Sequence, residues 1–146
     1  MARIIAEVCQ NHNGDVELLK DMVAQAAEAG ATWVKMQSIF SEDLTHRPQF
    51  DTGKDDSGKE YIVRPYEPEF ERMTSLDLPP EAHATFVETC REHGVLPMTT
   101  IFSRGRIRLA KEAGFAGVKV ASYDCASFPL LRELRDAFEF LSLIHI

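Results

Sequence analysis

Arg3-Ile-Ile-Ala-Glu-Val-Cys-Gln-Asn-His-Asn-Gly14 joins an apolar strand to a polar turn. The run from Ile4 to Val8 has the length and composition of a buried strand, and Glu7 is its only charged residue. A carboxylate in a core strand is costly unless it is paired or used. The run ends in a cluster of hydrogen-bonding side chains, which is typical of strands that build enzyme sites. Two interpretations are open: a functional Glu7, or a satisfied buried glutamate beside an ordinary turn.

The composition places limits on the class of protein. A chain of 146 residues has room for one domain, and its mean hydropathy of −0.20 is that of a soluble globular protein. The net charge of −7 argues against a nucleic-acid surface. Glu7 interrupts the first apolar run after five residues, which argues against a signal peptide at the N-terminus. No segment reaches the length of a membrane span. The three cysteines are far apart, which favours free thiols in a cytoplasmic protein.

Strands and helices are expected to alternate along the chain. Hydrophobic periodicity predicts helices over 15–30, 80–94 and 104–114 and from Ser127 onward, with Asp15 and Ser127 as N-caps. Further strands are expected at 31–37, 95–102, 116–122 and 138–146. Strict alternation predicts an α/β fold with a parallel sheet and right-handed crossovers.

Two architectures fit this alternation: an open doubly wound sheet and a (β/α)8 TIM barrel. No glycine-rich phosphate-binding motif follows the first strand. Polar residues recur instead at the ends of several strands, which is typical of barrels. We therefore expect a partial TIM barrel with parallel strands 1–5 and outer helices.

The segment 38–78 lacks periodicity and carries Pro48, Pro65 and Pro68. A long loop within a compact domain is usually functional, disordered or built of small elements. Gly53 and Gly58 suggest a turn or a short hairpin. Because the segment follows the second strand, we expect it to cover the C-terminal ends of the strands as a lid.

Two lysines lie in matched contexts, in Val34-Lys-Met-Gln37 and in Val118-Lys-Val-Ala-Ser122. If the valines pack on the helices, Lys35 and Lys119 both point into the barrel mouth. Two ammonium groups repel each other, so an anion is expected between them, such as a phosphate and a carboxylate on one small molecule. The alternative is that each lysine reaches water at the rim of its strand.

The histidines carry a weaker signal. His12 in the polar turn is more typical of a turn hydrogen-bonding residue than of a metal ligand. His83 and His93 fall on a predicted helix and are expected to be structural or solvated.

Four motifs together carry a family resemblance: residues 6–14, Val34–Gln37, Thr99–Phe102 and Lys119–Ser122. In this order they resemble the N-acetylneuraminate (sialic acid) synthase family. The resemblance implies a TIM barrel followed by a small antifreeze-like domain. It implies condensation of phosphoenolpyruvate with an N-acetylmannosamine-type sugar to a nine-carbon 2-keto acid, with release of phosphate and use of a divalent metal, typically manganese.

The resemblance also implies roles for single residues. The lysines that bind phosphoenolpyruvate fall on Lys35 and Lys119, and the sugar-contacting carboxylate and amide fall on Glu7 and Gln37. The phosphate-side hydroxyls fall on Thr100 and Ser122. The implied catalytic residues are thus Glu7, Lys35 and Lys119. The implied substrate-binding residues are Gln37, Thr100 and Ser122.

The resemblance extends from Arg3 to about Leu141, with departures. Cys9, Ile101 and Tyr123 stand where the family usually has glycine, proline and glycine, which blurs the choice of sugar. Residues 1–146 are expected to form the N-terminal portion of a truncated barrel, and residues after about 141 are doubtful as native sequence. Metal ligands are expected beyond residue 146, with His145 no substitute. The full-length parent is expected to be a cytoplasmic homodimer without nucleic-acid or membrane partners.

Two rival functions remain open from the sequence. One is a Schiff-base aldolase with Lys35 or Lys119 as nucleophile. The other is a non-catalytic half-barrel, because strands 1 and 5 would be unpaired edges and the fragment alone would be inactive. Borohydride trapping with a keto acid separates the aldolase from the synthase, which forms no such adduct.

Overall fold

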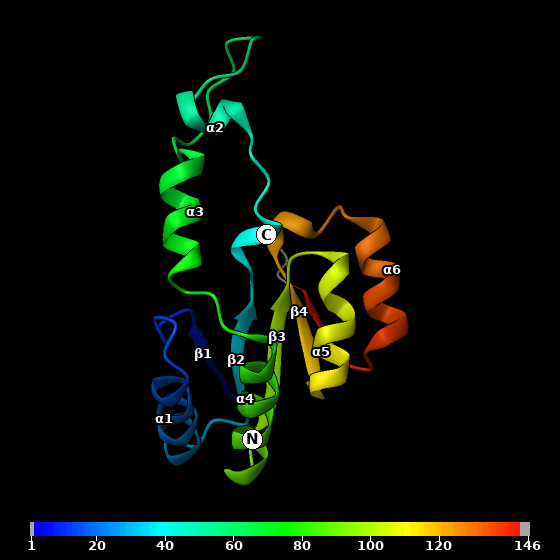
Figure 1. Ribbon diagram of the computed structural model, residues 1–146. Helices are drawn as coiled ribbons and strands as arrows, with labels where there is room; N and C mark the ends of the chain where they lie inside the picture. Colours follow the sequence, from blue (N-terminus) through cyan, green and yellow to red (C-terminus); the bar gives the residue numbers. More distant parts are fainter. Residues whose placement is uncertain (1, 144–146) are drawn as a thin grey trace. The chain divides into compact units, whose positions relative to one another are not determined.

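A computed structural model describes residues 2–143. Five parallel strands form one sheet in the order β1-β2-β3-β4-β5 (Figure 1). The strands are β1 (Ile5–Cys9), β2 (Trp33–Ser38), β3 (Leu96–Ile101), β4 (Gly117–Val120) and β5 (Leu141–Leu143). The strand order therefore follows the chain order, as the alternation predicts.

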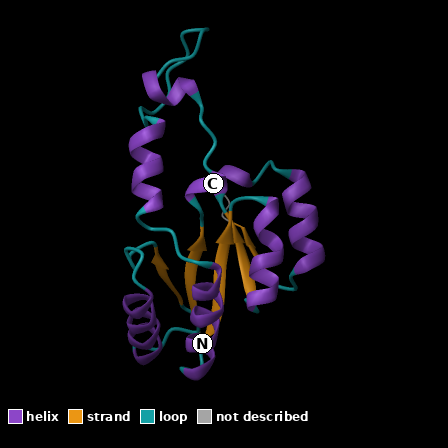
Figure 2. Cartoon of the chain, viewed as in Figure 1, coloured by secondary structure: helices purple, strands orange, loops and turns teal. Residues whose placement is uncertain are grey.

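The helices between these strands form one layer. They are α1 (Val16–Glu28), α4 (Pro80–Glu92), α5 (Ile107–Ala113) and α6 (Phe128–Ala137), with the short 3-10 turns η2 (Arg104–Arg106) and η3 (Ser122–Asp124). They contact one another in chain order, α1 with α4, α4 with α5 and α5 with α6 (Figure 2). A doubly wound sheet needs a reversal of strand order, which this sheet lacks. The prediction of a partial barrel with outer helices is confirmed.

Side-chain alternation gives the sheet two different faces. Val34, Met36 and Val118 lie in the hydrophobic core and pack against the helix layer. The helices contribute amphipathic stripes to the same core, and the stripe predicted for α4 is fully buried. Its members are His83, Phe86, Val87 and Cys90. We call the opposite side of the sheet, turned away from α1, α4, α5 and α6, the inner face.

Helix α1 begins and ends where the sequence predicts. The Asp15 carboxylate accepts hydrogen bonds from the backbone N–H groups of Glu17, at 2.8 Å, and Leu18, at 3.2 Å. This N-cap satisfies two donors that the helix itself leaves open. Gly30 follows the helix with a φ of 89°, the left-handed conformation in which glycine is favoured.

The inner face carries packed apolar side chains near the amino ends of β2 and β4. The rings of Trp33 and Phe140 stack at 4.8 Å, and Trp33 and Met98 are buried. Gly117 leaves the space for this stack, because a Cβ atom there would lie 2.7 Å from Phe140 Cδ1 and 3.2 Å from Trp33 Cζ3. The glycine at the start of β4 is therefore required by packing.

Residues 40–77 form a second compact unit with elements of its own. They include η1 (Ser41–Asp43), α2 (Pro48–Thr52) and α3 (Tyr66–Thr74). An antiparallel bridge between Lys54 and Glu60 confirms the hairpin predicted near Gly53 and Gly58. The helices were not predicted, because α3 buries only Met73 and so lacks an apolar stripe. The lid role of this segment stays a prediction.

The hairpin of this unit is held by one carboxylate. Asp55 accepts hydrogen bonds from the N–H groups of Ser57 and Lys59 and from the Tyr61 hydroxyl. These donors favour the charged form and lower the pKa of Asp55 to about 2, with the Ser57 side chain as the largest cause. The turn is thus stabilised by an ionised aspartate.

Two predictions near the end of the chain are wrong in detail. The last strand, predicted to begin at residue 138, begins at Leu141, because Phe138 is buried at the end of α6 and Phe140 stacks on Trp33. Ser127 occupies the N-cap position of α6, but its side chain makes no capping hydrogen bond. Residues 144–146, including His145, lie outside the described residues.

No helix within residues 2–143 combines the length and the apolar composition needed to cross a membrane.

The packing at Gly117 gives a stability prediction. Gly117→Ala should lower the free energy of unfolding by about 1–3 kcal/mol, because the new methyl group displaces the Trp33–Phe140 stack. Urea denaturation measures the change. Gly105→Ala is the control, because a Cβ atom there meets nothing closer than the Ser103 hydroxyl at 3.9 Å. Equal effects of the two substitutions would contradict the packing role.

Candidate functional site

A buried lysine lies at the centre of the inner face. The Lys35 ammonium is 2.6 Å from Glu7 Oε2 and donates a hydrogen bond to Thr100 Oγ1 at 3.0 Å. The Lys35 side chain is 3% exposed, whereas that of Glu7 is 44% exposed. Three neighbouring strands, β1, β2 and β3, therefore meet at one ammonium group.

The backbone at the end of β1 orients Glu7. Glu7 is paired in register with Lys35, and the register then shifts, so that Cys9 is paired with Met36. The Cys9 N–H donates to Glu7 Oε1 at 3.1 Å, so each oxygen of the carboxylate has a partner. Cys9 has a φ of 51°, a conformation that side chains other than glycine rarely adopt. The glycine usual at this position in the resembled family fits the same backbone without strain.

Burial and charge act on Lys35 in opposite directions. Burial is the largest effect and lowers the pKa of Lys35, while the hydrogen bond and the charge of Glu7 raise it. The charge of Lys119 lowers the pKa of Lys35 further. The two ammonium groups therefore lie close enough to interact, as expected for two lysines on one face.

A polar row crosses the sheet above Lys35. Gln37, Thr100 and Lys119 are paired in register across β2, β3 and β4. Because paired residues of neighbouring strands point to the same face, this row lies on the inner face with Lys35. Predicted residues from three strands are thus brought together, and neither lysine points into the helix layer.

The structure changes the charge argument made from the sequence. Glu7 is a counter-charge of Lys35 within the chain itself. The sequence could have suggested this pair, because both residues lie on the inner faces of adjacent strands. Among the residues that the structure describes, no carboxylate pairs with Lys119. Lys119 lies beside Thr100 on the neighbouring strand.

Ser122 lies outside β4, although the predicted strand 116–122 included it. It is exposed and opens η3, because β4 ends at Val120. Its hydroxyl makes no hydrogen bond within residues 2–143. Tyr123, which follows it, is 66% exposed. Ser122 is thus placed after the carboxyl end of β4, without a fixed partner.

Two histidines near the sheet are buried, and one of them lies in the turn that follows β1. His12 is 2% exposed, and its Nδ1 accepts the Gly14 N–H at 3.0 Å, which confirms its role in the turn. Burial lowers the pKa of His12. His83 on α4 is 1% exposed, and burial lowers its pKa, while a hydrogen bond to the Pro79 carbonyl acts in the opposite direction. Burial therefore disfavours the charged form of both imidazoles.

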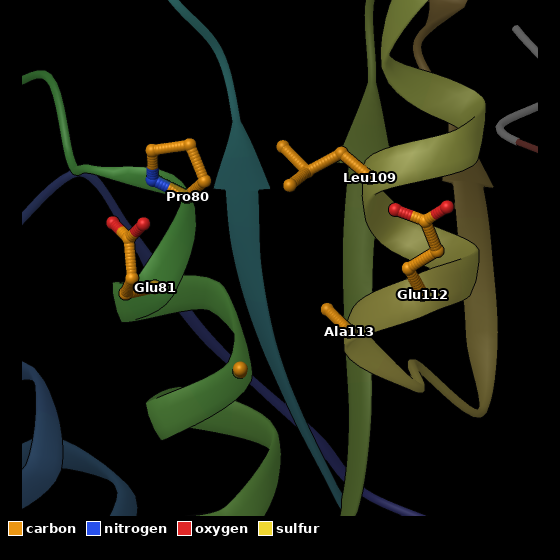
Figure 3. A pocket seen from close by; sticks show the side chains of 6 residues that line it. Pro80, Glu81, Leu109, Glu112 and Ala113 are labelled. Atoms are coloured by element: carbon orange, nitrogen blue, oxygen red, sulfur yellow. The ribbon is translucent and has the colours of Figure 1, made fainter.

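The residues present do not form a metal centre. Within residues 2–143, no group of three or more His, Cys, Asp or Glu side chains is placed to hold a metal ion. A hollow of about 260 Å³ lies between α4 and α5, lined by Pro80, Glu81, Ala84, Leu109, Glu112 and Ala113 (Figure 3). It contains none of the predicted site residues.

The Glu7–Lys35 pair gives a first prediction. Glu7→Gln should lower the pKa of Lys35 further, because the buried ammonium loses its counter-charge, and should cost about 1–3 kcal/mol of stability. NMR titration of the Lys35 side chain and urea denaturation measure the two effects. Glu17→Gln is the control, because it removes the exposed pair with Lys20, 2.9 Å apart, and should change little. An unchanged Lys35 pKa would contradict the pairing.

The buried histidines give a prediction on pH. Their pKa values are lowered in the folded chain, so unfolded molecules take up protons first as the pH falls below the ordinary value of 6.5. The free energy of unfolding should therefore decrease between about pH 7.5 and pH 5.5. Denaturation at each pH tests this. His12→Asn should flatten the profile, whereas His93→Asn at an exposed position should not; equal profiles for both would contradict the assignment to His12.

Known proteins resemble this chain in sequence. The NeuB family model matches residues 22–143. The spore coat polysaccharide biosynthesis protein SpsE of Bacillus subtilis is 30% identical over 129 residues, which cover 88% of this chain and 33% of that protein. The N,N'-diacetyllegionaminic acid synthase of Legionella pneumophila is 29% identical over 88% of this chain and 35% of its own length.

Solved structures share the fold. The sialic acid synthetase of Leptospira borgpetersenii, solved with citrate, superposes with a TM-score of 0.75 at 24% identity, over 96% of this chain and 43% of that chain. The chain spans about a third of the length of the curated relatives it matches. The matched family model covers most of the sequence, so the chain belongs to the NeuB family.

Proposed function

We propose that this chain carries the phosphoenolpyruvate-binding part of an enzyme that condenses phosphoenolpyruvate with an N-acetylmannosamine-type sugar. The product would be a sialic-acid-like nonulosonate, with release of phosphate. Family membership supports a synthase of this general kind, since relatives include legionaminic, pseudaminic and N-acetylneuraminate-9-phosphate synthases. These relatives make different acids, so the proposal commits to an N-acylated amino sugar as a class.

One observation carries the proposal. Lys35 and Lys119 lie on the inner face of alternate strands, with Thr100 between them and hydrogen-bonded to Lys35. Two ammonium groups and a hydroxyl match a small molecule that carries both a phosphate and a carboxylate. Glu7 neutralises only one of the two lysines, so binding of the anion would neutralise the other.

The residues of this chain would act by binding and positioning. In the reaction, C3 of phosphoenolpyruvate forms a bond to the aldehyde carbon of the sugar, water adds at C2, and the C2–O bond to phosphate breaks. Lys35 and Lys119 would neutralise the anion and hold C3 toward the aldehyde. Glu7, which is partly exposed, and Gln37 would contact the sugar.

A divalent metal, manganese in the expectation from the resemblance, belongs to the proposal for the whole enzyme. Within residues 2–143, no group of three or more His, Cys, Asp or Glu side chains is placed to hold it. A cytoplasmic homodimer is proposed on the same resemblance. The free thiols of Cys9, Cys90 and Cys125 fit a reducing compartment.

The Schiff-base aldolase stays the second candidate, because burial lowers the pKa of Lys35 as a nucleophilic amine requires. Against it, Glu7 at 2.6 Å favours the charged ammonium. Borohydride with pyruvate distinguishes the two functions. A covalent adduct on Lys35 or Lys119 would favour the aldolase and contradict the synthase.

Binding of phosphoenolpyruvate tests the proposal directly. Lys119→Ala should raise the Kd by about 10- to 100-fold, because a charge-assisted contact worth about 1.5–3 kcal/mol is lost. Isothermal titration calorimetry measures it. The control is Lys111→Ala, which removes an exposed lysine of α5 and should leave the Kd unchanged. Equal loss in both variants would indicate only a general charge effect.

A phosphate-release assay with phosphoenolpyruvate, N-acetylmannosamine and manganese gives an independent readout. We expect no turnover by residues 1–146, since their relatives are about three times as long. Turnover would contradict this expected inactivity but not the binding proposal.

A further inference from the structure

A second pair of hydroxyls lies directly behind the lysine site. Thr99 and Thr100 are consecutive on β3, so their side chains point to opposite faces of the sheet. Thr100 contacts Lys35 on the inner face. On the helix side, Thr99 Oγ1 is 2.7 Å from the hydroxyl of Ser38, the last residue of β2. Thr99 is 0% and Ser38 1% exposed.

One arrangement of the two hydroxyl groups satisfies both contacts of Thr99. Thr99 Oγ1 lies 3.3 Å from the carbonyl oxygen of Thr100, which can only accept, so the Thr99 hydroxyl donates to it. In this arrangement the Thr99 oxygen accepts a hydrogen bond from the Ser38 hydroxyl. The result is an ordered chain from the Ser38 hydroxyl, through Thr99, to the peptide of Thr100.

Packing alone does not call for this chain. The same face carries Met36, Ile101 and Val118, all fully buried in the apolar core. Alanine at 38 and valine at 99 would fit the apolar surroundings, and replacing both partners of a buried hydrogen bond by apolar groups of similar shape can be nearly neutral for stability. What the hydroxyls add is a further contact to the peptide that carries the Thr100 side chain, besides the strand pairing with β2 and β4.

We propose that Ser38 and Thr99 are positioning residues, which fix Thr100 from behind the sheet and through it the Lys35 ammonium. Neither residue touches the inner face. Their effect passes through one peptide, because the Thr100 carbonyl and the Thr100 hydroxyl belong to the same residue. The proposal concerns the anion site of the proposed function, but its test uses no phosphoenolpyruvate and so can fail separately.

The experiment measures the pKa of Lys35 by side-chain NMR in folded variants. Thr100→Val removes the hydroxyl that Lys35 contacts and should lower the Lys35 pKa, because the buried ammonium loses a partner. The double variant Ser38→Ala with Thr99→Val should shift the pKa in the same direction, by no more than Thr100→Val. Thr99→Ser keeps a hydroxyl at this position and should leave the Lys35 pKa at its wild-type value.

The matched control is Thr89→Val on α4. Thr89 is also buried and also donates to a carbonyl, that of Thr85 at 2.9 Å, but it lies in the helix layer. Its loss should leave the pKa of Lys35 unchanged, whatever it does to stability. If the double variant does not fold, Ser38→Ala alone removes the first donor and should give a smaller shift in the same direction. A Lys35 pKa unchanged in the Ser38 and Thr99 variants, but lowered in Thr100→Val, would overturn the proposal.

Discussion

The ion pair between Glu7 and Lys35 is the interaction on which the candidate site depends. A lysine buried to this degree is costly unless its charge is neutralised, and Glu7 at 2.6 Å provides the neutralisation. The pair also explains features of the backbone around it. The register shift in β1 and the left-handed conformation of Cys9 bring an N–H group to the second oxygen of the carboxylate. Strain at the end of β1 is thus tied to the orientation of a charged group.

The sheet carries the candidate site on its inner face and the hydrophobic core on its other face. Side chains that alternate along each strand keep the two sets apart. Odd positions of β2, such as Lys35 and Gln37, lie on the inner face, while Val34 and Met36 fill the core beneath the helices. The inner face is itself divided along the strands. Trp33 and Phe140 pack over Gly117 near the amino ends of β2 and β4. The charged side chains of Lys35 and Lys119 lie closer to the carboxyl ends of these strands. A packed apolar base next to the charged side chains is well suited to hold those charges in position.

The sequence contained enough information for the order and type of the main elements. Period-2 alternation in β2 and the apolar stripe of α4 are local signals, and the structure has a strand and a helix at these positions. Helices α2 and α3 gave no such signal, because they bury little apolar surface. The start of β5 was predicted too early, because Phe138 and Phe140 fall in one apolar run, although Phe138 lies in the core beside the helices and Phe140 stacks on Trp33.

The sequence predicted which residues form the candidate site better than it predicted the contacts between them. Residue type and alternation were sufficient to select Lys35, Thr100 and Lys119. The partner of Lys35 depends on strand register and on the shift in β1, which no local pattern reveals. The Ser38–Thr99 bond likewise needs the spatial pairing of two strands 61 residues apart. Interactions of this kind are decided by tertiary structure, so the sequence alone did not indicate them.

The central claim is that Lys35 and Lys119 share one anion on the inner face. A crystal structure of the chain with bound phosphoenolpyruvate tests it most directly. The account predicts oxygen atoms of one phosphoenolpyruvate molecule within hydrogen-bond distance of both ammonium groups, with Glu7 still beside Lys35. Phosphoenolpyruvate bound away from the inner face, or in contact with neither lysine, would contradict it.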